Sequence, residues 1–154
     1  MVQTVSVSIE RPDSEVARVL INQLDADLLQ RYPAQWIHGL HPEDVADPDL
    51  VFVVARLGPQ PVGCGALRRL ESGVGEIKRM FVPPAFRGQG IARQILGSLE
   101  SIARKAGYSK LRLETGTKQP EAVGLYRSAG YQQIPCFGEY IGNPFSVCFE
   151  KELR

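Results

Sequence analysis

Short stretches in which hydrophobic and polar residues alternate recur along the chain, and they predict β-strands. Residues 2–9 alternate imperfectly, with valine or isoleucine at positions 2, 5, 7 and 9. Segments 50–57 and 61–70 are two more candidates, and Gly58-Pro59-Gln60 between them is typical of a hairpin turn. Further strands are expected over residues 74–82, around Leu111 and Leu113, and over 131–137 and 144–150.

Helices are predicted where hydrophobic residues recur every three or four positions. The first follows the helix-start sequence Pro12-Asp13-Ser14 and runs to about Gln30. Residues 31–49 are broken by proline and glycine, with room for one short helix. A second helix is expected from Ile91 to Ala106, and a third from Pro120, which suits a first helical turn, to Gly130.

This order of elements predicts an α+β domain. A strand and a helix come first, then a run of antiparallel strands, then strand, helix and strand. The expected architecture is a mixed, mostly antiparallel sheet flanked by helices. The sequence shows neither an internal repeat nor a linker, so residues 1–154 are expected to form a single domain.

Charge and cysteine content narrow the functions that remain. The chain has 18 basic and 17 acidic residues, so no general attraction to nucleic acid or to an anionic membrane is expected. Neither a signal peptide nor an apolar run of the length of a membrane span is recognisable. Cys64, Cys136 and Cys148 are odd in number and lack C-x-x-C spacing, which favours a reducing, cytoplasmic location over a disulfide framework.

The most informative segment is a glycine-rich loop, residues 87–92, between a predicted strand and a predicted helix. Such a loop leaves backbone N–H groups unpaired at the positive end of the helix dipole, where phosphate binds well. Gly88 and Gly90 admit a ligand close to the backbone, and Arg87 adds a forked set of donors. A tight turn without a ligand uses glycines in the same way, so the loop alone leaves both interpretations open.

Two common phosphate-binding loops do not match this segment. A P-loop requires Gly-Lys followed by Ser or Thr, but Ile91 follows Gly90. A dinucleotide-binding fingerprint requires a third glycine where this chain has Arg93, and it opens the first of two βαβ halves. Here three or four predicted strands precede the loop.

Two segments resemble the signatures of the GCN5-related N-acetyltransferase (GNAT) superfamily. Residues 76–92 are similar to the strand, glycine loop and helix of its central motif, in the variant Arg-Gly-x-Gly-(Ile/Val)-(Ala/Gly). Residues 122–131 are similar to its second signature, Ala-x-x-Leu-Tyr-x-x-x-Gly-(Phe/Tyr). The two signatures place the resemblance over residues 74–131, and it extends back to residue 50. Before residue 50 it rests only on the order of the predicted strands and helices. It implies the GNAT fold, with a sheet splayed near Val82 and Glu114 to admit acetyl-coenzyme A (acetyl-CoA).

The resemblance also implies acetyl-CoA as co-substrate and no metal. In the family the strand pairs with the pantetheine arm and the loop takes the pyrophosphate. Gln119 stands where many members have an asparagine that contacts coenzyme A, and its longer side chain leaves that contact open. The expected coenzyme-binding residues are Met80, Phe81, Val82, Arg87, Gly88, Gln89, Gly90, Ile91, Ala92 and Gln119.

Glu76 and Tyr126 are the catalytic candidates that the resemblance implies. An amine with a pKa of about 10.4 must lose a proton before it attacks a thioester, and Glu76 lies where histone-type members carry a general base. The alternative is a strand glutamate paired with Lys78 or Arg79. Tyr126 lies near the departing sulfur in the family and is the candidate general acid; the alternative is a tyrosine that only packs.

The expected activity is direct transfer of an acetyl group to a primary amine. A small-molecule acceptor is favoured because the chain has no added reader domain and no acidic tract. Alternatives are a protein or peptide acceptor, a non-catalytic acyl-CoA sensor, or an interaction module; a homodimer is compatible with the family. Tyr32, Trp36 and Tyr140 occupy segments that shape the substrate pocket in family members.

Two other features are interpreted as structural. His38 and His41 form an H-x-x-H without a further histidine or a nearby cysteine, so they are expected to be loop residues rather than metal ligands. Cys64, between two glycines, is expected to be a small buried strand residue, since direct transfer requires no cysteine nucleophile.

Overall fold

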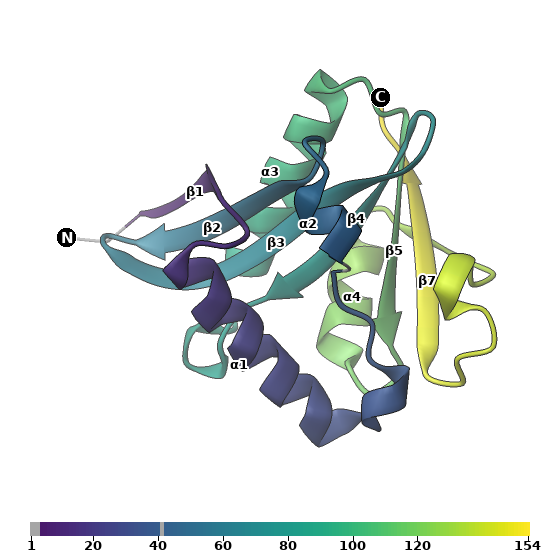
Figure 1. Cartoon of the computed structure of the whole chain (residues 1–154), viewed down its shortest axis with the longest axis horizontal. Coiled ribbons are helices and arrows are strands. Elements are labelled where there is room, and N and C mark those ends of the chain that lie inside the picture. Colours follow the sequence, from purple (N-terminus) through teal and green to yellow (C-terminus); the bar gives the residue numbers. More distant parts are fainter. Residues whose placement is uncertain (1–3, 41) are drawn as a thin grey trace.

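The computed structural model describes residues 4–40 and 42–154, and in them a single sheet organises the fold (Figure 1). Its strands lie in the order β1-β2-β3-β4-β5-β7-β6. Neighbours are antiparallel except β4 and β5, which are parallel. The predicted mixed, mostly antiparallel sheet is therefore confirmed. Residues 1–3, the start of the first predicted strand, and His41 lie outside the described residues.

The predicted strands and helices are present. The strands are β1 (Val5–Glu10), β2 (Val51–Leu57), β3 (Gln60–Glu71), β4 (Val74–Phe81), β5 (Lys110–Gly116), β6 (Gln132–Ile134) and β7 (Ser146–Glu152). The helices are α1 (Glu15–Arg31), α2 (Pro42–Ala46), α3 (Ile91–Lys105) and α4 (Pro120–Ser128), with 3-10 turns at Ala34–Trp36, Pro84–Phe86 and Gly138–Tyr140. β6 is shorter than predicted, because Pro135 has no N–H to continue the ladder.

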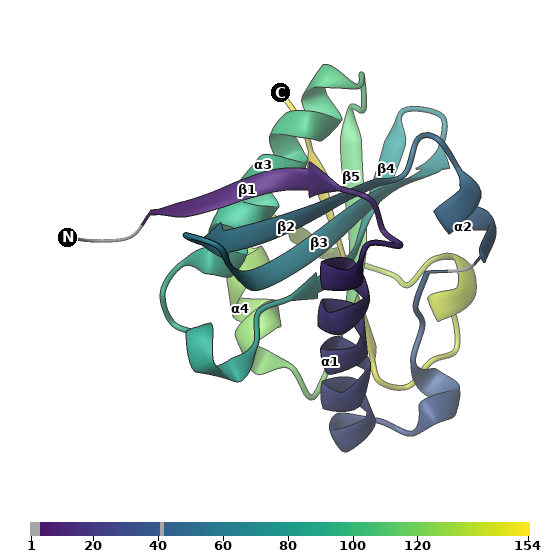
Figure 2. The ribbon, with the colours of Figure 1, turned by 60° about the vertical axis from the view of Figure 1, so that its left-hand side comes forward.

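Strand periodicity divides the core between the two faces of the sheet. Val53 and Ala55 of β2 belong to the core beneath α3, whereas Phe52 and Val54 belong to the core beneath α1. Since successive side chains of a strand point to opposite faces, the apolar run of β2 serves both layers. Figures 1 and 2 show α1 and α3 on opposite sides of the sheet. Cys64 is fully buried in β3, as predicted.

A β-bulge changes the course of β4 near the middle of the sheet. Ala66 of β3 is aligned with Lys78, but Cys64 is aligned with Phe81, so β4 carries one extra residue. Arg79 in the bulge has a φ of 57°, in the left-handed region. Bulges bend a strand and increase its twist. The parallel pairing of β4 with β5 ends at Ile77 and Leu113, after which the two strands separate. The predicted splay is confirmed, and it begins here.

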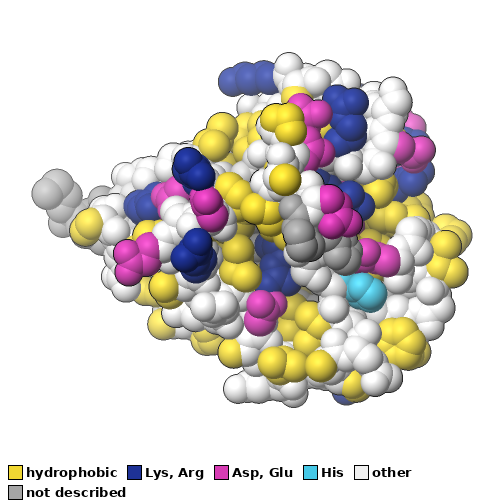
Figure 3. Space-filling view, in the orientation of Figure 1, with side chains coloured by type: hydrophobic (Ala, Val, Ile, Leu, Met, Phe, Trp, Pro, Cys, Tyr) yellow, Lys and Arg dark blue, Asp and Glu magenta, His cyan; other side chains and the backbone are white. Residues whose placement is uncertain are grey.

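Charged and hydrophobic side chains are mixed on the surface of the molecule that faces the viewer in Figure 1. Figure 3 shows acidic, basic and hydrophobic side chains interspersed, with basic side chains set back in a hollow near the centre. Lys78 and Arg79, whose side chains are each 4% exposed, supply buried positive charge on this side of β4. Within the described ranges, no helix is both long and apolar enough to cross a membrane.

Candidate active site

Two cavities adjoin where β4 and β5 separate. We call the first the loop groove; it has a volume of about 290 Å³ and lies between the end of β4, residues 86–90, the start of α3, and α4. We call the second the central pocket; it has a volume of about 100 Å³ and lies between α1, residues 36–38, β4, β5 and the segment 140–145. Five residues line both cavities: Leu24, Met80, Gln119, Ala122 and Tyr126.

The loop groove contains the glycine loop that the sequence singled out. Gly88 and Gly90 have φ angles of 80° and 79°, and Gly90 caps α3 without any side-chain hydrogen bond. The first N–H groups of α3 therefore remain available to an anion at the positive end of the helix. Arg87 donates from Nε to the carbonyl oxygen of Val82 at 2.8 Å, which holds the guanidinium beside the groove. This arrangement fits a pyrophosphate.

Gly90→Ala is expected to weaken acetyl-CoA binding about tenfold, because the free loop relaxes away from the left-handed conformation and regaining it on binding costs roughly 1–2 kcal/mol. No protein atom lies within 4 Å of an added Cβ, so the loss comes from the backbone and from the approach of the ligand. Calorimetry with acetyl-CoA measures it. Gly97→Ala, in α3 and equally free of neighbours, is the matched control. Equal affinities for the two variants would contradict a phosphate-binding role for this loop.

The end of β4 offers the free strand edge that the resemblance predicted. Beyond Ile77, the edge of β4 that faces β5 has no strand partner in the described part of the chain. Met80, Phe81 and Val82 all line the loop groove. A linear ligand can therefore add to this edge through main-chain hydrogen bonds, as an extra strand does.

Most of the predicted coenzyme-binding residues lie together. Gln89 is exposed and is absent from the lining of both cavities. The predicted residues that line the loop groove are Met80, Phe81, Val82, Arg87, Gly88, Gly90, Ile91, Ala92 and Gln119.

Glu76 is fully buried, and both of its carboxylate oxygens are engaged. Arg68 Nε donates to Oε1 at 2.7 Å, and the Tyr140 hydroxyl donates to Oε2 at 2.5 Å. Arg68 lies directly opposite Glu76 on β3, so the ion pair crosses the strands instead of joining Glu76 to Lys78 or Arg79. Glu76 lines neither cavity. These contacts suit a residue that positions Tyr140.

Glu114 is a carboxylate that the sequence analysis placed at the splay without assigning it a role. It lines the central pocket from β5, and Ser146 Oγ donates to its Oε2 at 2.6 Å. Burial raises the pKa of Glu114 to about 7, against the lowering effect of the Ser146 hydrogen bond and the Lys78 charge. A carboxyl group with this pKa exchanges protons near neutral pH.

Charged groups of β4 and of the 3-10 turn Gly138–Tyr140 act on Glu114, among them Lys78 and Glu139. Lys78 Nζ lies 3.5 Å from an oxygen of Glu139 and 5.6 Å from the centre of the Tyr140 ring. His38 Nδ1 lies 3.3 Å from the same oxygen of Glu139. The predicted assignment of His38 to a loop is confirmed, but its ring also lines the central pocket. In residues 4–40 and 42–154, no group of His, Cys, Asp or Glu is arranged to hold a metal ion.

Tyr126 lies where the two cavities meet. It projects from α4, is 5% exposed, and lines both the loop groove and the central pocket. Burial, followed by the charge of Glu114, raises the pKa of the Tyr126 phenol. The phenol therefore stays protonated at neutral pH and can donate a hydrogen bond at the junction.

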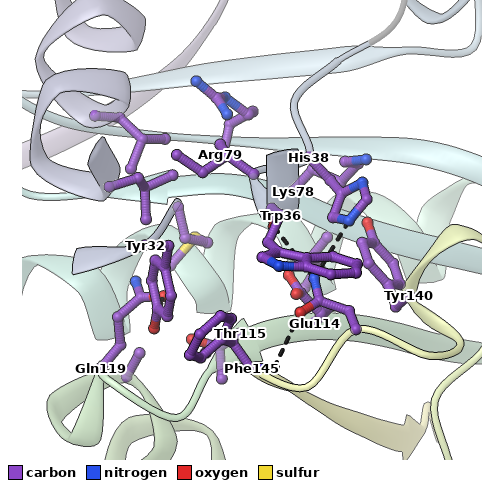
Figure 4. Close-up of a pocket in the computed structure, with 18 of the residues that line it drawn as sticks. Tyr32, Trp36, His38, Lys78, Arg79, Glu114, Thr115, Gln119, Tyr140 and Phe145 are labelled. Atoms are coloured by element: carbon purple, nitrogen blue, oxygen red, sulfur yellow. Dashed lines mark hydrogen bonds between the residues drawn. The ribbon is translucent and has the colours of Figure 1, made fainter. Parts of the chain in front are cut away.

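The predicted acceptor residues converge on the central pocket from distant parts of the chain (Figure 4). Trp36 is held by a hydrogen bond from Asn143 Nδ2 to its carbonyl oxygen at 3.2 Å. The Tyr140 ring meets the His38 ring edge-on, with centroids 5.2 Å apart. Tyr32, directly after α1, donates to Gln119 Oε1 at 3.2 Å, so this hydrogen bond orients the Gln119 amide.

Comparisons with known proteins agree with this geometry. Residues 21–131 match the family model described as the acetyltransferase (GNAT) family. The chain is 43% identical over 150 residues to the IAA acetyltransferase of Azospirillum brasilense, covering 97% of this chain and 98% of that protein. A Klebsiella pneumoniae structure described as an acyl-CoA N-acyltransferase superposes with a TM-score of 0.83 at 34% identity, covering 98% and 99% of the two chains.

A further neighbour contains the ligand. The structure of a GNAT family acetyltransferase from Elizabethkingia anophelis has acetyl-CoA bound; it matches with a TM-score of 0.71 at 18% identity over 97% of this chain and 98% of its own.

The splayed sheet, the glycine loop and the adjoining pocket define an acyl-CoA-dependent acyltransferase. The chain belongs to the acetyltransferase (GNAT) family, as the sequence resemblance predicted, and acetyl-CoA is its acyl donor.

Proposed function

We propose that this acetyltransferase acetylates the primary amine of a small molecule by direct attack on acetyl-CoA. The observation that carries the proposal is that Glu114 and Tyr126 line two adjoining cavities with a shared wall. Glu114 faces the central pocket, and Tyr126 lies at its junction with the loop groove. A proton acceptor is thus available on the amine side and a proton donor on the thioester side.

We assign the general base to Glu114. A carboxylate with a pKa of about 7 is a stronger base than an ordinary glutamate and is still substantially ionised at neutral pH. It takes the proton of the amine, directly or through water, as the amine attacks the acetyl carbon. Glu76 is less suited, since Arg68 and Tyr140 already occupy its oxygens. A catalytic role for Glu76 remains a sequence-based prediction. Comparing the activities of Glu76→Gln and Glu114→Gln tests it.

Tyr126 is the proposed general acid. As the carbon–sulfur bond breaks, the coenzyme leaves as a thiolate, and a protonated phenol at the junction donates its proton or a hydrogen bond to that sulfur. The high pKa of the buried phenol keeps the proton in place until the thiolate forms in the same water-poor surroundings.

The size and lining of the central pocket favour a small acceptor. With a volume of about 100 Å³, it has room for the amine end of a small molecule. Trp36, Tyr140 and Phe145 give the pocket an aromatic lining that suits the carbon skeleton of a small organic molecule. The Azospirillum relative is called an IAA acetyltransferase, which is consistent with a small-molecule acceptor here.

Calorimetry of the purified protein tests the donor site first. Micromolar binding of acetyl-CoA, about −8 kcal/mol, is expected, with no binding of ATP. Release of the coenzyme A thiol is then followed with a panel of small primary amines and, separately, with lysine-containing peptides. Turnover with small amines supports the proposal. Turnover with peptides alone would reassign the acceptor class, and binding without turnover on either panel would favour an acyl-CoA sensor.

A further inference from the structure

Two cysteines that take no part in the chemistry above lie sulfur to sulfur. Cys148, in β7, donates its S–H to the sulfur of Cys136 at 3.0 Å. Cys136 follows β6 and in turn donates to the carbonyl oxygen of Ser146 at 3.7 Å. Both thiols are free. The two sulfurs are about 1 Å further apart than the roughly 2.05 Å of a disulfide bond, so a small movement joins them.

The pair borders the central pocket without lining it. Cys148 is aligned with Glu114 across the β5–β7 ladder. Cys136 immediately precedes Phe137 and the 3-10 turn Gly138–Tyr140. That turn carries Glu139 to Lys78 and Tyr140 to Glu76. A change at the cysteines therefore acts on the wall of the pocket that faces the proposed base.

We propose that Cys136 and Cys148 form a peroxide-sensitive modification site, which closes into a reversible disulfide and restrains the acceptor side of the active site. The proposal does not depend on the identity of the acceptor. It fits a protein without a disulfide framework, because disulfides in reducing compartments are usually transient and redox-sensing.

The oxidation is a two-electron reaction with hydrogen peroxide. The sulfur of Cys136 attacks one peroxide oxygen, the O–O bond breaks, and a sulfenic acid and one water form. The sulfur of Cys148 then attacks the sulfur of Cys136, releasing the sulfenic oxygen as a second water and forming the S–S bond. In sum, two thiols and one peroxide give one disulfide and two waters. A dithiol such as dithiothreitol returns two electrons and restores both thiols.

The surroundings of the thiols set the order of these steps. Cys136 is half-buried and is the first to meet peroxide, whereas Cys148 is 1% exposed and attacks afterwards. The Cys148 S–H points at the Cys136 sulfur, so the two sulfurs are already adjacent for the second step. Cys64 is a natural internal control, because burial raises the pKa of its thiol to about 12 and Cys64 is hydrogen-bonded within the sheet.

Thiol counting and mass spectrometry of the full chain test the proposal. After hydrogen peroxide, the number of free thiols is expected to fall from three to one, with a mass lower by two hydrogens and a Cys136–Cys148 cross-link on peptide mapping. Dithiothreitol is expected to reverse all three changes. Cys64→Ser is the matched control and should still form the cross-link. Cys136→Ser should not form the cross-link. If that variant fails to fold, Cys148→Ala replaces it and should not form the cross-link either.

Two further measurements show whether the disulfide acts on the central pocket and not on the loop groove. Trp36 is the only tryptophan of the chain and lines the central pocket, so its fluorescence is expected to change on oxidation of the wild type but not of Cys136→Ser. The affinity for acetyl-CoA is expected to stay within about twofold, below 0.5 kcal/mol. A chain that keeps three free thiols in peroxide, a cross-link between two copies, or a cross-link through Cys64 would overturn the proposal. An unchanged Trp36 signal in the cross-linked protein would overturn the link to the pocket.

Discussion

Glu114→Gln is expected to lower kcat/KM for the amine by about 10²- to 10³-fold at pH 8, within the usual contribution of a general base. Glutamine keeps the length of the side chain and can still accept the Ser146 hydrogen bond, but it cannot take a proton. Steady-state kinetics with any amine found by the thiol-release screen measures the loss. The affinity for acetyl-CoA should be nearly unchanged, because Glu114 lines only the central pocket.

The pH profile separates loss of a base from a general disturbance. The base acts when it is deprotonated, so the rate of the wild-type enzyme is expected to rise with pH through the Glu114 pKa of about 7. Glu114→Gln is expected to lose this inflection. A variant that is slower at every pH but keeps the inflection would show that another group titrates.

Thermal unfolding provides the stability control. The pKa of Glu114 in the folded protein, about 7, lies above its ordinary value of 4.5, so the folded state binds the proton more tightly than the unfolded state. The free energy of unfolding therefore falls as the pH rises between these two values. A neutral glutamine removes this loss, so Glu114→Gln should melt no lower than the wild type at pH 8.

Glu76→Gln is the contrasting variant. It replaces the partly buried ion pair with Arg68 by a neutral contact, and we expect the free energy of unfolding to fall by about 1.5–3 kcal/mol. Its kcat/KM per folded molecule should fall far less than that of Glu114→Gln. The reverse order of the two activities would restore Glu76 as the base and remove Glu114 from that role.

The second large effect is expected at the junction of the two cavities. Tyr126→Phe keeps the buried ring and removes only the hydroxyl, so kcat should fall by about 10²-fold while acetyl-CoA binding stays nearly intact. Single-turnover kinetics measures the chemical step apart from product release. Unchanged turnover would remove the general-acid assignment.

Tyr131→Phe is the matched control for that experiment. Tyr131 is also buried, 5.9 Å from the ring of Tyr126, but its hydroxyl donates to Glu100 at 2.8 Å and it lines neither cavity. Loss of this hydroxyl should affect stability rather than kcat. If both variants lost activity equally, packing of the ring pair would explain the effect of Tyr126→Phe.

The parts of the site that depend on neighbouring residues in the sequence were predictable. Gly88 and Gly90 occupy left-handed positions that favour glycine, and α3 begins directly after them. The start of the helix and the conformation of the loop follow from these local rules. The same is true of Tyr126, which the family signature fixes within α4.

Features that depend on distant contacts were not predictable in the same way. The pKa of Glu114 depends on its burial and on Ser146 and Lys78, which lie on other strands. The alternative to a general base for Glu76 was an ion pair along its own strand, whereas the cross-strand register places Arg68 opposite it. The sequence does contain one indication of where the Glu114 side chain lies. Leu111 and Leu113 point into the core, and side chains alternate along a strand, so the carboxylate of Glu114 points to the opposite face of β5.

We expect the wall shared by the two cavities to couple the binding of the acyl donor to that of the acceptor. Because Gln119 and Tyr126 border both spaces, an acyl donor in the loop groove completes one end of the central pocket. The proposed amine is then expected to meet a closed surface instead of an opening and to bind more tightly. Linkage makes this reciprocal, so a bound amine must retain the donor equally well. We expect this coupling to limit hydrolysis of the acetyl-CoA thioester in the absence of an acceptor.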